Sequence, residues 1–95
     1  MTLGNRIKTN RYEDYTTIIL EIEDNIHSPD IPKVRAELQA IGTIVSENSL
    51  HTIDKHDSDL HYGWKFVARS DQSNNTIERA ISNIASILSG DLTTV

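Results

Sequence analysis

Cysteine is absent from this 95-residue chain, and proline, glycine and aromatic side chains are scarce. Without thiols the chain can form neither a disulfide nor a thiolate metal site, so its stability must come from packing. The four glycines stand singly, which leaves no glycine-rich loop to cradle a phosphate. A chain that needs no disulfide suits a reducing compartment, and we expect a cytoplasmic location.

Long hydrophobic runs and clustered positive charge are also missing. No stretch approaches the roughly 18 apolar residues that span a bilayer, and the opening MTLGNRIK lacks the apolar core of a signal peptide. We therefore expect no membrane association. The 9 Lys and Arg against 14 Asp and Glu give a formal net charge of −5. This balance argues against direct nucleic-acid binding, which needs clustered cations.

The sequence contains no recognisable catalytic frame. Its serines and histidines lack the glycine turn that exposes a nucleophile, and no nucleotide-binding or paired-carboxylate signature appears. We therefore expect that the protein is not an enzyme and needs no cofactor.

Length and polarity set the domain organisation. A chain of 95 residues forms one domain with one core, and its 37% hydrophobic and 24% charged residues are typical of a folded protein. Residues 1–15 are polar and aperiodic, which predicts a flexible or irregular N-terminal arm. Residues 16–90 should form a single α+β domain, and residues 91–95 a short tail.

The first predicted strand starts at Thr16, where apolar and polar side chains alternate. A helix should follow near residue 30, either with Ser28 as its cap and Pro29 as its first residue, or with Asp30 as its cap. Gly42 stands where a left-handed residue would end that helix. The apolar positions expected to face the core are Ile18, Leu20 and Ile22 in the strand, and Ile31, Val34, Leu38 and Ile41 in the helix.

Two more strands and a second helix complete the pattern. Residues 43–55 favour a strand with a bulge near Asn48 and Ser49, and residues 60–69 alternate again. The aromatic side chains of this last strand either stack bases or pack in the core, and the alternation favours the core. Asn75 and Glu78 match a helix-capping pattern. The apolar positions are Leu60, Tyr62, Trp64, Phe66 and Ala68 in the strand, and Ile77, Ile81, Ile84 and Leu88 in the helix.

The order strand, helix, strand, strand, helix predicts an antiparallel sheet with both helices on one face. It resembles the ferredoxin-like, split β-α-β two-layer sandwich. The pattern departs from that fold at residues 91–95, which are barely long enough for its last strand. If that strand is missing, the strand that starts at Thr16 lies at an open edge, and an open edge invites a partner.

Acidic residues suggest how such a protein would act. We expect it to occupy the surface of another, basic protein through an acidic face and the edge strand, as an inhibitor, an immunity-type protein or a regulatory subunit. The expected partner-binding residues are Glu13, Asp14, Glu21, Glu23, Asp24, Asp57 and Asp59.

A second hypothesis concerns the loop DNIHSPD between the first strand and the first helix. Its position resembles the ligand loop of ACT-type amino-acid-binding domains, although the glycine of that loop is missing here. The resemblance implies a small-ligand sensor that forms a homodimer through its sheet. Ligand contacts would come from His27, Ser28 and Asp30.

A third hypothesis is a metal site in the hairpin between the last two strands. Imidazole and carboxylate ligands suit Zn²⁺, Ni²⁺ or Mn²⁺, but the spacing matches no recognised motif, and Asp is also common in exposed turns. The candidate ligands are His51, Asp54, His56, Asp59 and His61.

Overall fold

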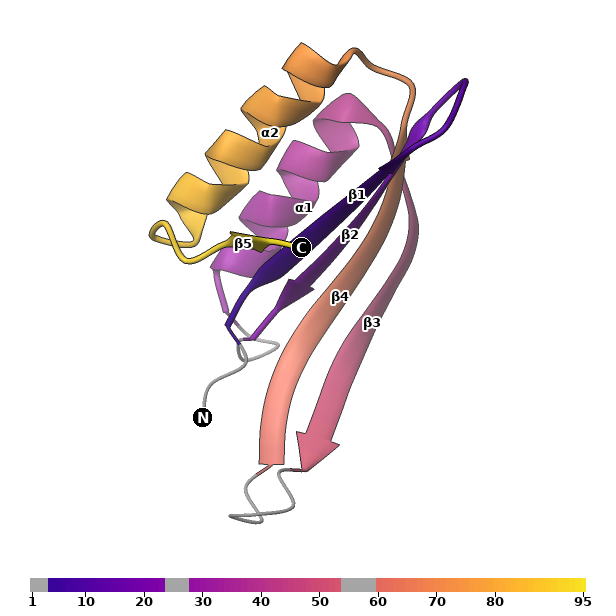
Figure 1. Cartoon of the computed structure of the whole chain (residues 1–95). Helices are drawn as coiled ribbons and strands as arrows, with labels where there is room; N and C mark the ends of the chain where they lie inside the picture. Colours follow the sequence, from indigo (N-terminus) through magenta and orange to yellow (C-terminus); the bar gives the residue numbers. More distant parts are fainter. Residues whose placement is uncertain (1–3, 24–27, 54–59) are drawn as a thin grey trace.

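The computed structural model describes residues 4–23, 28–53 and 60–95, with the side chains of 4–23, 28–49 and 63–95. These residues form a five-stranded mixed sheet with two helices on one face (Figure 1). No helix in these ranges is long and apolar enough to cross a membrane. The elements in chain order are β1 (Arg6–Arg11), β2 (Thr16–Ile22), α1 (Asp30–Ile41), β3 (Thr43–Ile53), β4 (Leu60–Ser70), α2 (Asn74–Ile87) and β5 (Thr93–Thr94).

Strand β2 lies inside the sheet, which corrects the expectation that it forms an open edge. The strand order is β3-β4-β2-β1-β5, so β2 pairs antiparallel with β4 on one side and with β1 on the other. Its backbone groups are therefore occupied by its own chain. The edges of the described sheet are β3 and the two-residue β5.

Strand β1 occupies residues 6–11 of the segment expected to be an irregular arm. Ile7 is buried and pairs with Leu20 of β2, while its neighbours Arg6 and Lys8 are exposed. A strand with a single core residue shows no apolar alternation. Sequence periodicity therefore could not reveal it.

The expected α+β class holds, but the specific ferredoxin-like order is not confirmed. Strands β2 and β3 flank β4 and are joined by α1, which is the anticipated split β-α-β arrangement. Next to β2, however, lies β1, with β5 beyond it. Because β5 pairs parallel to β1, the sheet is mixed rather than antiparallel.

The core lies between the helices and one face of the sheet. The predicted helix stripes are buried there, with Ala80 added and Ile81 only partly buried. Phe66 is fully buried, and Trp64 is half-buried against the same cluster, which confirms the core interpretation for these two aromatic residues. The core consists of Ile7, Ile18, Leu20, Ile22, Ile31, Val34, Leu38, Ile41, Phe66, Ala68, Ile77, Ala80, Ile84 and Leu88.

The end of α1 docks on the end of β4, and Gly42 makes this possible. Ser70 Oγ donates to the carbonyl of Ile41 at 2.6 Å. A Cβ on Gly42 would lie 2.2 Å from the carbonyl oxygen of Arg69. Gly42 has an extended backbone (φ −176°) rather than the left-handed conformation expected from the sequence. The glycine is needed for close approach of two backbones.

The bulge in β3 lies at Val45, three residues before the predicted position. Ile44 pairs with Ala68 and Ser46 with Val67, so Val45 is the extra residue. Its side chain is 58% exposed. A bulge turns one residue out of the alternation, and here that residue is apolar.

Candidate functional site

The face of the sheet opposite the helices, here called the open face, is covered by no described element (Figure 1). Its membership follows from strand alternation, because successive side chains point to opposite faces. In β2 the residues from Thr16 to Ile22 alternate between buried and half-buried, so Thr17, Ile19 and Glu21 lie on the open face. Cross-strand pairing extends this assignment to the other strands.

Positive charge dominates the described strand side chains of the open face. Glu21 is the carboxylate among them, and its Oε2 lies 2.9 Å from Nη2 of Arg6. Glu21 also pairs in register with Lys65. The strands of this face therefore carry more cations than carboxylates, although the chain as a whole is acidic. The cations of this face are Arg6, Lys8, Lys65 and Arg69.

An apolar strip runs through the middle of these charges. Ile19 of β2 pairs with Val67 of β4, and both are half-buried. A shallow hollow of about 220 Å³ lies to one side of the strip and reaches the exposed Val95. It is lined by Arg6, Lys8, Ile19, Glu21, Lys65 and Val95.

A larger hollow of about 380 Å³ lies at the other end of the open face, where β2, β3 and β4 meet. The guanidinium carbon of Arg69 lies 4.5 Å from the centre of the Tyr15 ring, within the range of a cation–π interaction. Tyr15 in turn stacks on Tyr12, with ring centres 5.0 Å apart. The hollow is lined by Tyr15, Gly42, Thr43, Val45, Arg69 and Asp71.

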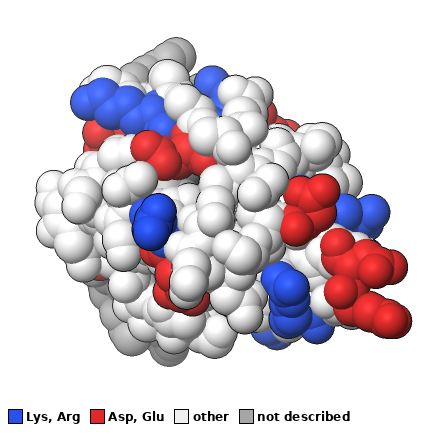
Figure 2. Space-filling view, turned by 90° about the horizontal axis from the view of Figure 1, so that it is seen from above, with Lys and Arg blue, Asp and Glu red and all other residues white. Residues whose placement is uncertain are grey.

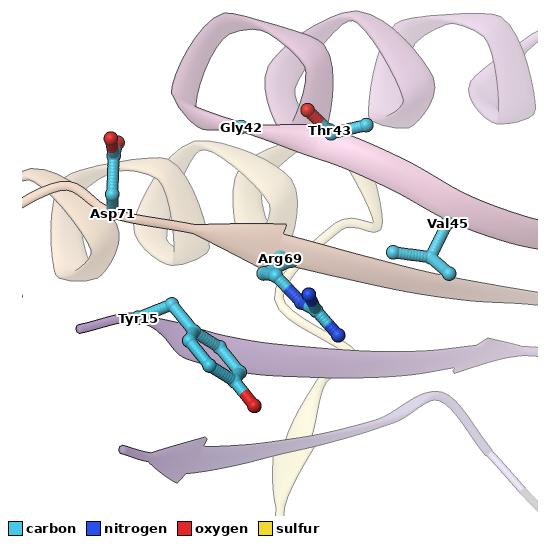
Figure 3. Close-up of a pocket in the computed structure, with 6 residues that line it drawn as sticks. All are labelled: Tyr15, Gly42, Thr43, Val45, Arg69 and Asp71. Carbon is cyan, nitrogen blue, oxygen red and sulfur yellow. The ribbon is translucent and has the colours of Figure 1, made fainter. Parts of the chain in front are cut away.

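Figure 3 shows how the side chains of this larger hollow are arranged. The Arg69 side chain lies between the Tyr15 ring and Val45, and the Asp71 carboxylate points away from the guanidinium. The bulge therefore places an apolar side chain beside the cation–π pair. Stacking restricts the rotamers of Arg69, so less conformational entropy remains to be lost when a ligand binds.

The structure does not gather the described members of the expected acidic face. Glu13 and Asp14 are exposed in the turn between β1 and β2, whereas Glu21 and Glu23 lie at the far end of β2. Glu23 also accepts a hydrogen bond from the backbone of Gly4. Figure 2, which views the molecule from the end where the β1–β2 hairpin projects, shows red and blue side chains interleaved. Asp24, Asp57 and Asp59 lie outside the described residues.

The expected ligand loop is only partly described, because His27 lies outside the described residues. Ser28 Oγ accepts from the backbone N–H of Asp30 at 3.2 Å, and its carbonyl accepts from Ile31. The helix begins at Asp30 with Pro29 as its N-cap and no side-chain capping bond, so neither of the two predicted capping schemes is confirmed. The two hydrogen bonds to Ser28 still satisfy backbone donors at the start of α1. They give Ser28 a structural role in starting the helix.

The expected metal site also falls largely outside the described part of the chain. This holds for Asp54, His56 and Asp59, and for the side chains of His51 and His61. Among the side chains that are described, no group of three or more potential ligands comes together. The metal hypothesis therefore stays a prediction.

A polar cluster on the helix side of β3 joins three elements. Glu47 Oε1 accepts from Arg35 of α1, with Nη2 at 2.6 Å and Nε at 2.8 Å, and from Nε1 of Trp64 at 3.1 Å. The hydrogen bond from Arg35 lowers the pKa of Glu47 and outweighs the opposing effect of burial, with further lowering by Trp64. The cluster fixes Trp64 on the core side, away from the open face.

Sequence reasoning missed the open face. Lys8, Tyr15, Lys65 and Arg69 are far apart in sequence, and only the pairing of β1 with β2 and of β2 with β4 brings them to one side. The available signal was the alternation itself, since each strand position opposite a core residue faces outward. The chain matches no protein-family model, and neither the curated proteins nor the solved structures show significant similarity to it.

Proposed function

We propose that this chain is a non-catalytic, cytoplasmic protein-binding protein, an inhibitor, immunity-type protein or regulatory subunit that occupies a partner's surface with its open face. The observation that carries the proposal is the excess of cations on a sheet face that no described element covers. The proposed partner surface is acidic, the reverse of the basic partner that the net charge suggested.

The composition of the open face supports a protein partner. Arg and Tyr are enriched at the centres of protein interfaces, where they act as anchors. Arg69 and Tyr15 are already stacked, and Ile19 and Val67 supply an apolar strip between charges. The large exposed apolar side chains of the described chain are Tyr12, Val45 and Val95, and all three lie beside this face. Exposed apolar groups ringed by charge are typical of interaction surfaces.

A matched pair of charge-reversal variants tests the proposal. Lys8→Glu with Arg69→Glu reverses two cations of the open face, and Lys33→Glu with Arg79→Glu reverses two exposed cations on the helices. Both double variants have the same net charge, so a general electrostatic effect alters both equally. Immobilised wild-type protein and both variants are used to capture partners from nuclease-treated extracts, followed by titration of the purified partner.

We expect the open-face variant to bind about 100-fold more weakly than the wild type, because several contacts change from attractive to repulsive. The helix variant should bind like the wild type. Equal binding of all three proteins would reject the open face as the contact surface. Binding to a labelled single-stranded oligonucleotide but not to a poly-glutamate peptide would show that the acidic partner is nucleic acid and not protein.

A further inference from the structure

Strand β3 forms a long edge of the sheet. Among the described strands it pairs with β4 alone, along its length from Thr43 to Ile53. In Figure 1 no other element lies beyond it. An edge strand presents a row of backbone donors and acceptors to solvent, which is a template for another strand.

This edge lacks most of the features that usually protect an edge strand. Natural proteins block edges with Lys, Pro, bulges or very short strands. The sequence of β3, TIVSENSLHTI, contains neither Lys, Arg nor Pro, and its bulge at Val45 lies near one end. The opposite edge differs, because β1 carries Lys8 and Arg11, and β5 covers its first two residues. Of the two edges of the described sheet, β3 is the long one, and beyond Glu47 its sequence carries no Lys, Arg, Asp or Glu.

The residues beyond the bulge allow antiparallel pairing with a second copy of the same strand. If two copies of β3 align antiparallel about Asn48, then Ser46 lies opposite Leu50 of the second copy, and Glu47 lies opposite Ser49. No like charges face each other in this register. The Glu47 carboxylate is already held by Arg35 within its own chain. A two-fold axis through Asn48 repeats each contact, as in the common isologous dimer.

Charge also favours this arrangement over stacking of two sheets. A face-to-face dimer would bring two positively charged open faces together, and the repulsion would oppose it. Edge-to-edge pairing instead places the two open faces side by side. We propose that the chain forms a homodimer by antiparallel pairing of β3 with β3 of a second copy, which makes one continuous ten-stranded sheet from the two five-stranded sheets.

One substitution separates dimerisation from folding. Asn48 is exposed and pairs in register with Lys65 of its own chain. In Asn48→Asp the new carboxylate gains an attractive neighbour within the monomer but meets its own copy across the two-fold axis. Asn48→Thr is the matched control, because it adds no charge and favours a strand.

The measurement is molar mass by light scattering over a series of concentrations, at low and high salt. We expect the wild type and Asn48→Thr to approach twice the 10.7 kDa mass of one chain as concentration rises. Asn48→Asp should dissociate at least about tenfold more readily at low salt, and high salt should restore part of its dimer. Its circular dichroism and unfolding midpoint in dilute solution should match those of the control.

A wild-type mass of one chain at every concentration would overturn the proposal, and the β3 edge would then be open to another protein. A dimer that Asn48→Asp leaves intact would also overturn it, because that dimer must use a different surface. The proposal does not depend on the acidic partner proposed above. A wild-type dimer that binds no acidic partner would support the homodimer and reject the acidic partner of the open face.

Discussion

The side-chain amide of Asn5 donates to the backbone carbonyl of Asp91 at 2.8 Å, across 86 positions of the chain. The same side chain accepts from the backbone N–H of Glu23 at 2.9 Å, and the carbonyl of Asn5 accepts from Thr93. Asn5 is 8% exposed, so these bonds form away from bulk water. One residue therefore joins the start of β1, the end of β2 and the segment after α2.

Substitution of Asn5 should destabilise the whole sheet rather than only its terminus. Asn5→Ala leaves two backbone groups without their partner, and we expect a loss of about 2 to 3 kcal/mol in the free energy of unfolding. Asn5→Asp should cost more, because a carboxylate oxygen then faces the Asp91 carbonyl. Urea denaturation measures both. The control is Asn10→Ala, a half-exposed site on β1, the strand that follows Asn5. Equal effects at the two positions would contradict the role of Asn5.

The Glu47 cluster predicts a specific dependence of stability on pH. The pKa of Glu47 is lowered in the folded protein below its ordinary value of 4.5, chiefly by the hydrogen bond from Arg35. The ionised carboxylate therefore stabilises the fold at pH values above the unfolded pKa. This contribution disappears as the pH falls through the folded pKa. The side chains of Arg35 and Glu47 are 34% and 26% exposed, so solvent screening reduces its size.

Glu47→Gln should lower the free energy of unfolding by about 1 kcal/mol at neutral pH, after allowing for partial exposure. The difference from the wild type should shrink toward zero in acid, where the wild-type carboxylate is protonated too. Urea unfolding at several pH values measures it, with Glu78→Gln at an exposed site on α2 correcting for the change in net charge. A difference that stays constant from neutral to acid pH would show that the glutamate charge is not responsible.

The sequence predicted those features that recur with a fixed period. Ile18, Leu20 and Ile22 alternate because one face of β2 is buried, and Val34 and Leu38 repeat because one side of α1 is buried. Burial imposes these patterns locally, so they can be read without knowledge of the rest of the fold.

The order of the strands could not be read in this way. Ile7 is a single apolar residue in a polar stretch, and its strand is held by pairing with β2 and by contacts of Asn5 with residues near the C-terminus. These contacts are long-range, so no local pattern records them. The same limit applies to the candidate site. Net charge suggested an acidic surface, whereas strand pairing collects cations from β1 and β4 on one face.

At the N-terminus of α2, the residue that caps the helix differs from the one that the sequence pattern predicted. The pattern suggested Asn75 as the cap, but the helix begins at Asn74, and Ser73 Oγ accepts from the backbone N–H of Thr76 at 3.4 Å. Ser73→Ala should therefore cost about 1 kcal/mol. Asn75 lies inside the first turn. Asn75→Ala should therefore be neutral or slightly stabilising, because Ala has the higher helix propensity. Thermal unfolding of both variants measures the two losses of stability. A larger loss for Asn75→Ala than for Ser73→Ala would show that Asn75 is the cap.

Two glycines should respond to substitution for different reasons. At Gly42 any Cβ meets the backbone of Arg69, at 2.2 Å from its carbonyl oxygen, so α1 must shift away from β4. We expect Gly42→Ala to cost about 3 kcal/mol. At Gly90 the space is open, but φ is +79°, so Gly90→Ala should cost about 1 kcal/mol through backbone strain alone.

Asparagine distinguishes these two causes, because it tolerates a positive φ better than alanine does. Gly90→Asn should therefore be more stable than Gly90→Ala, whereas Gly42→Asn should be at least as unstable as Gly42→Ala. The free energy of unfolding of the four variants in urea provides the comparison. If asparagine were to rescue position 42, the constraint there would be backbone conformation, and the close packing of α1 on β4 would not explain the glycine.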